Sequence, residues 1–125
     1  MTRAYGETIS TDAVVLRVTD GKFRNVGPMF QGIDIDYGGT VLLKVDNVNI
    51  IVTTRRLPVN DIGFFNIHEI EINDFQLICI KAKNHFRASF SPYCRDFIEV
   101  DTPGPAAINL HTLPYRFANL EEFVR

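Results

Sequence analysis

The sequence predicts a mixed α/β fold close to the α+β class: a β-sheet with an antiparallel meander in its first half, two short helices packed on it, and an irregular C-terminal tail. Short runs rich in Val, Ile and Thr, bounded by Gly, Asp and Asn, are typical of strands joined by tight turns. Two later segments place a polar residue ahead of an apolar, aromatic stretch, which is typical of a helix start. The last part of the chain carries apolar side chains without a period, so it predicts no regular element.

The first half of the chain contains the predicted strands, which are residues 12–19, 33–37, 40–45 and 48–53. Asp20 and Gly21 follow the first of them and form a dipeptide that suits a hairpin turn. Asp46 and Asn47 separate the last two as a two-residue turn. We therefore expect the last three strands to form an antiparallel meander, whereas residues 22–29 look too irregular for an element.

The second half of the chain predicts two helices with a strand between them. Asp61 is a favourable N-cap for a short helix over residues 62–68. The apolar run 75–80 is short, β-branched and bounded by polar residues, so it predicts a buried strand. Asn84 then stands where the N-cap of a second helix over residues 85–93 would be.

The length of 125 residues is that of one domain. We expect residues 1–10 to be a flexible lead-in and residues 11–105 to form the domain, with a last short strand over 97–100. We expect the tail, residues 106–125, to wrap the domain or contact a partner, and its apolar side chains leave homo-oligomerisation possible.

Composition excludes several classes of function. A net charge of −2 argues against a general nucleic-acid binder, which is normally basic. No apolar run approaches membrane-spanning length and no signal peptide is evident, so we expect a cytoplasmic protein without membrane contact. Cys79 and Cys94 lie in no metal-binding motif, so we expect no metal site built from this chain alone.

Basic side chains gather where the predicted strand 75–80 meets the second helix: Lys81, Lys83, His85 and Arg87. In open α/β sheets ligands bind at the carboxyl ends of strands, and a helix N-terminus favours anions. The arrangement predicts a site for an anion or a carbonyl oxygen. The alternative is a solvated basic turn with His85 packed against the sheet.

Four blocks of the sequence together resemble a known family. They are GKFRNVGPM at residues 21–29, VTTRR at 52–56, KAKNHFRASF at 81–90 and IEVDTPG at 98–104. Their order and spacing are similar to the C-terminal domain of the microcystin-degradation protein MlrC (microcystinase C) family of zinc metallopeptidases, from about residue 11 to about residue 114. Ala82 stands where the family often has a small hydroxyl residue, and Thr54 stands where it more often has Ser.

The resemblance implies that the zinc cofactor and its ligands belong to a larger N-terminal domain of the family. The histidines of this chain, His68, His85 and His111, are scattered without the spacing of zinc ligands. We therefore expect an excised domain with no cofactor of its own. Its expected partners are an MlrC-like N-terminal catalytic domain, in cis or in trans, and a peptide or small anionic substrate.

The resemblance also implies that the basic turn faces a substrate cleft. The candidate substrate-binding residues are Arg55, Arg56, Lys81, Asn84, His85 and Arg87. His85 is the candidate catalytic residue, since imidazole is a side chain that can transfer a proton under physiological conditions, and Arg87 suits a two-pronged carboxylate contact. The predicted function is an accessory domain of a zinc-dependent amide or peptide hydrolase, inactive alone. The alternative is a stand-alone module that binds small anions or serves in interaction or oligomerisation.

Overall fold

The computed structural model describes residues 8–100. Every helix and strand of this part lies in one compact unit, Thr11–Asp96, whereas Met1–Ser10 and Phe97–Arg125 belong to a second unit. The predicted tail, residues 106–125, lies outside the described residues. Residues 97–100, predicted as a strand, form none, because no described strand pairs with them. No described helix is long or apolar enough to cross a membrane.

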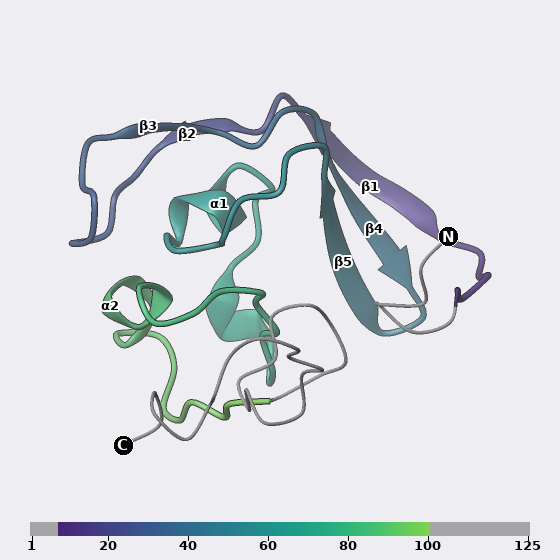
Figure 1. The fold of residues 1–125 in the computed structure, drawn as a ribbon. Helices are drawn as coiled ribbons and strands as arrows, with labels where there is room; N and C mark the ends of the chain where they lie inside the picture. The colour runs from purple at the N-terminus through teal and green to yellow at the C-terminus, as the bar shows by residue number, and fades with distance from the viewer. Residues whose placement is uncertain (1–7, 101–125) are drawn as a thin grey trace, which may run out of the picture. The chain divides into compact units, whose positions relative to one another are not determined.

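A three-stranded antiparallel sheet forms one part of the Thr11–Asp96 unit (Figure 1). Its strands are β1 (Val14–Thr19), β4 (Thr40–Val45) and β5 (Val48–Thr53), in the order β1-β4-β5. The predicted β4–β5 hairpin is confirmed, and Asp46 adopts the left-handed φ of 50° that a tight turn of this kind requires.

The prediction that residues 33–37 form the first strand of the meander is wrong. These residues contain β3 (Asp34–Asp36), which pairs with β2 (Lys22–Arg24) in a separate two-stranded ribbon. The Asp20–Gly21 turn closes no hairpin between β1 and β2. Gly21 has a φ of +70° and lies so close to the Gly38 carbonyl that no side chain fits, and its own carbonyl accepts a hydrogen bond from Tyr37 N at 3.0 Å. This contact sends β2 away from the sheet, and β1 pairs with β4 instead.

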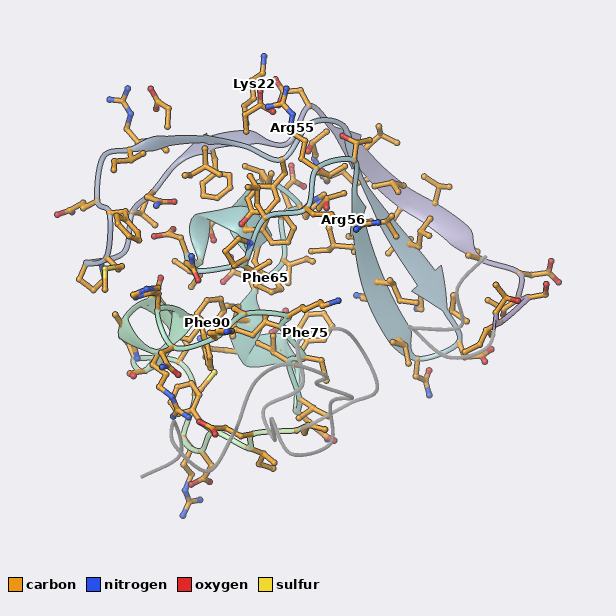
Figure 2. All side chains as sticks on the ribbon, viewed as in Figure 1. Lys22, Arg55, Arg56, Phe65, Phe75 and Phe90 are labelled. Atoms are coloured by element: carbon orange, nitrogen blue, oxygen red, sulfur yellow. The ribbon has the colours of Figure 1, made fainter. Side chains whose placement is uncertain are left out.

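An aromatic core joins the ribbon to the two helices, α1 (Gly63–Asn66) and α2 (Phe86–Phe90). The ring centroid of Phe64 lies 4.5 Å from that of Tyr37, with the two rings tilted, and 5.7 Å from that of Phe65. Phe65 in turn meets Phe90 of α2 edge to face, also at 5.7 Å, and Figure 2 shows these two rings at the centre of the unit. The mixed, sheet-dominated α/β class with two short helices is therefore confirmed.

The predicted buried strand over residues 75–80 is wrong. A short 3₁₀ helix, η2 (Ile72–Asp74), precedes this segment, and no described strand pairs with it. Phe75 and Leu77 are exposed, so the apolar run does not enter the core of the described residues. Asn84 is also not the N-cap of α2: His85 holds that position, and Asn84 contributes only its carbonyl, which accepts from Arg87 N at 3.3 Å.

Candidate functional site

The basic turn before α2 keeps most of its predicted side chains at the surface. Lys81, Lys83, Asn84 and His85 are exposed, and Arg87 is half-buried. The ring of His85 meets the ring of Phe30 edge to face at 6.0 Å, so it packs on the β2–β3 loop and not on the sheet. The Arg87 guanidinium lies 5.6 Å from the centre of the Phe86 ring, within cation–π range. The turn therefore keeps Lys83, Asn84 and His85 at the surface, directly before α2.

Arg55 and Arg56 lie elsewhere in the unit. The Arg55 guanidinium pairs with the Asp36 carboxylate at 2.7 Å and donates to the Asp36 carbonyl at 3.3 Å. Arg56 is exposed, and the two side chains leave the chain in different directions (Figure 2). In the same view Arg55 lies near Lys22, far from Phe90 of α2. The structure thus groups Lys81, Asn84, His85 and Arg87 in one turn but places Arg55 apart from them.

The two acidic residues of β3 each pair with an arginine: Asp34 with Arg24 and Asp36 with Arg55. Asp34 accepts two hydrogen bonds from Arg24, at 2.7 and 3.0 Å, and they lower the pKa of the Asp34 carboxyl. The Gly38 N–H, and then the charge of Arg55, lower the pKa of Asp36. Both carboxylates are therefore ionised near neutral pH and act as structural anchors.

Asp61 joins the loop after β2 to the start of α1. Its buried carboxylate accepts hydrogen bonds from Val26 N at 3.2 Å, Gly27 N at 2.8 Å and Gly63 N at 2.8 Å. The last bond ties Asp61 to Gly63, the first residue of α1, but the N-cap is Ile62 and not Asp61 as the sequence predicts. The first two were not predicted, because no local pattern shows that the loop containing Gly27 and Pro28, here called the Gly-Pro loop, returns to this residue.

Ser89 attaches α2 to the same junction. It is buried, and its hydroxyl oxygen accepts from Ile62 N at 3.0 Å. Because Ser89 lies two residues after Arg87, this bond fixes the helix that presents Arg87 and His85. Sequence reasoning missed Ser89; the only available signal was a polar residue inside an apolar helix face.

His68 is the buried histidine of the unit. Its Nε2 lies 3.1 Å from Oγ1 of Thr40, which lies 2.7 Å from Oγ1 of Thr19. Burial, and then the charge of Arg17, lower the pKa of His68. Its Nδ1 has no hydrogen-bond partner in the structure as described. The residue is therefore neutral and structural at physiological pH.

Residues 8–100 contain no group of three His, Cys, Asp or Glu side chains that could hold a metal ion. His68 is committed to Thr40, and the carboxylate of Asp61 is committed to backbone N–H groups. The side chains of this part of the chain therefore do not fit a zinc centre.

Comparison with known proteins gives the chain its relatives. No curated protein matches the sequence. A crystal structure of a "Putative metallopeptidase" from Mesorhizobium sp. BNC1 is 33% identical, with a TM-score of 0.76 over 86% of this chain and 22% of that chain. This chain thus spans about a fifth of the length of that protein. The family described as MlrC C-terminus matches residues 1–116, which confirms the resemblance of the four sequence blocks. The chain belongs to the MlrC C-terminus family.

Proposed function

We propose that this chain is the substrate-contacting C-terminal module of an MlrC-like, zinc-dependent amide or peptide hydrolase. The observation that carries the proposal is the family match over residues 1–116, together with a relative called a metallopeptidase of which the chain covers 22%. That share leaves most of the relative's chain for a catalytic domain. The zinc would belong there, because residues 8–100 hold no suitable set of ligands.

In this proposal the turn before α2 orients the substrate. Arg87 holds a carboxylate of the substrate in a two-pronged contact, and Lys81 and Asn84 add donors beside it. His85, exposed and held by its ring contact with Phe30, hydrogen-bonds the substrate or transfers a proton. The junction of Ser89 with Ile62 supports this role, because it fixes the helix that carries Arg87.

Arg55 and Arg56 are included as substrate contacts from the loop after β5. Arg56 is the better candidate, because the ion pair with Asp36 engages Arg55. An arginine that already holds a carboxylate must give up that pair to bind a substrate carboxylate.

The test uses a chimera, defined as the Mesorhizobium protein with its matched region replaced by this chain. With zinc bound, the chimera should hydrolyse members of a short-peptide library that the parent protein hydrolyses, whereas the isolated chain with added zinc should hydrolyse none. Arg87→Ala should lower kcat/KM about tenfold or more, as expected for loss of a charge-assisted contact. Arg95→Ala is the matched control, since Arg95 is an exposed arginine that lies 4.0 Å from Asp96.

Two outcomes would contradict the proposal. An unchanged kcat/KM for Arg87→Ala would remove the substrate-contact role of the turn. Hydrolysis by the isolated chain would place the metal centre here and not in another domain. If the chimera is folded but inactive and the isolated chain binds acetate or phosphate through Arg87, the alternative function of a small-anion-binding module is favoured.

A further inference from the structure

Within residues 8–100, the three-stranded sheet carries a face made only of aliphatic residues that no described element covers. The strand registers place on this face Val15, Val18, Val41, Leu43, Val45, Val48, Ile50 and Val52, which we call the aliphatic face. In a regular strand Val15 and Val18 would point to opposite sides. The bulge between Val15 and Arg17 brings both to the same side as their partners Leu43 and Val41.

The opposite face is covered around Thr40 and Leu42, yet it is the more polar of the two. Thr40 and Leu42 on this face are only 2% and 4% exposed, and His68 bonds Thr40 there. Lys44 lies on the same face, where it is paired with Val14 of β1 and with Asn49 of β5. Antiparallel sheets with one solvated face normally turn their polar residues outward. This sheet does the reverse within the described residues.

The aliphatic face is highly exposed although all of its side chains are apolar. Val18 is 71% exposed and Val48 is 59% exposed, and no charged residue interrupts the face. Transient interfaces are about as polar as the rest of a protein surface, whereas permanent ones are more apolar. The aliphatic face therefore has the composition of a surface that stays covered.

We propose that the aliphatic face is the surface against which the remainder of an MlrC-family polypeptide packs. The inference rests on membership of the family and goes beyond the proposed function, because it assigns a docking surface and not a substrate contact. The occupant is a domain that presents an uncharged, apolar surface of its own and is joined to this region in the longer relative.

The size of the face favours a joined domain over a second copy of the chain. Three strands of six residues span roughly 20 by 14 Å, or about 280 Å². A stable complex of separate proteins usually buries about 800 Å² on each partner. A domain in the same polypeptide needs less area, because the connection acts as an effective concentration in the millimolar range. The Mesorhizobium protein fits this case, since the matched region is 22% of a single chain.

The first test uses the full 125-residue chain alone. Sedimentation velocity should give a monomer, and carbene footprinting read by mass spectrometry should label β1 and β5 strongly. A dimer that Val18→Lys/Ile50→Lys disperses would overturn the proposal in favour of a second copy. Weak labelling of β1 and β5 in a monomer would overturn it in favour of cover by the chain itself.

The second test uses the chimera. Labelling of β1 and β5 should fall at least about fivefold relative to the isolated chain, as expected when exposed side chains enter an interface core. Val18→Lys/Ile50→Lys should restore the labelling and raise the rate of proteolysis between the two parts about tenfold, because a buried lysine charge is unfavourable. Val14→Lys is the matched control, since Val14 is an exposed valine of β1 on the other face.

Equal labelling in the chimera and in the isolated chain would overturn the proposal. If the chimera does not fold, the same lysine pair is placed at the aligned positions of the intact Mesorhizobium protein, where it should raise proteolysis as above. None of these measurements depends on hydrolysis, so failure of the docking surface and failure of the proposed function remain distinguishable.

Discussion

The carboxylate of Asp61 accepts a hydrogen bond at 2.8 Å from the backbone N–H of Gly27, which lies 34 residues earlier in the chain. The same carboxylate accepts a hydrogen bond from Gly63 N at the first residue of α1. One buried side chain thus joins the Gly-Pro loop after β2 to the first helix. Because Ser89 binds the neighbouring Ile62 N–H, the position of the basic turn before α2 depends on this junction.

We expect Asp61→Ala to destabilise the protein by about 3 kcal/mol, because it leaves buried backbone N–H groups without an acceptor. Asp61→Asn keeps one acceptor oxygen and should cost less. Urea unfolding followed by circular dichroism measures both. Asp12→Asn is the control at an exposed aspartate, and it should change the free energy of unfolding by less than about 0.5 kcal/mol. A loss for Asp61→Ala no larger than that of the control would refute the role of the junction.

Gly27→Ala should be destabilising for steric reasons. An added Cβ would lie 2.5 Å from Ser89 Oγ and 2.8 Å from Asp61 Oδ2, so the junction would have to open. We expect a loss of about 2 kcal/mol in the free energy of unfolding. Gly39→Ala is the matched control, because its Cβ would meet only Thr54 Cγ2 at 3.9 Å. Similar denaturation midpoints for the two variants would show that the loop adapts without cost.

His68 should make stability depend on pH. Burial lowers its pKa below 6.5 in the folded state, so on acidification the unfolded chain takes up a proton before the folded chain does. The free energy of unfolding should therefore fall as the pH drops below about 6.5, and the fall should end below the folded pKa. Urea midpoints measured at a series of pH values test this prediction.

The pH test compares the same substitution at a buried and at an exposed histidine. His68→Gln should remove the fall in stability below pH 6.5, whereas His85→Gln, at an exposed histidine, should retain it. The pKa values of Asp34 and Asp36 are lowered from 3.8. Their protonation therefore affects stability at a much lower pH than the protonation of His68 does. A persistent slope in His68→Gln would assign it to another group.

Arg55 and Arg87 should act independently in the chimera. Figure 2 places Arg55 far from Phe90, the last residue of the helix that carries Arg87. Residues that are well separated and share no partner normally show additive effects on free energy. We expect the losses in log kcat/KM for Arg55→Ala and Arg87→Ala to add in the double variant. A coupling larger than about 0.5 kcal/mol would show that one substrate group bridges the two arginines.

Much of the fold follows from local pattern. The β4–β5 hairpin follows from two aliphatic runs about a two-residue turn, and α1 lies within the short helix predicted after Asp61. The errors arose where partners lie far apart in the chain. β3 alternates like a sheet strand but pairs with β2, and residues 75–80 are apolar enough for a strand but have no neighbour to pair with in the described structure.

The sequence by itself determined the family, the place of the first helix in the chain and the group of candidate side chains at residues 81–87, because these depend on residues near one another. Only the tertiary structure decided that Arg55 pairs with Asp36 and that Asp61 holds the Gly-Pro loop. It also decided that the aliphatic side of the sheet is the uncovered one. The physical reason is that alternation divides a strand into two faces, but only contacts between distant segments decide which face is covered.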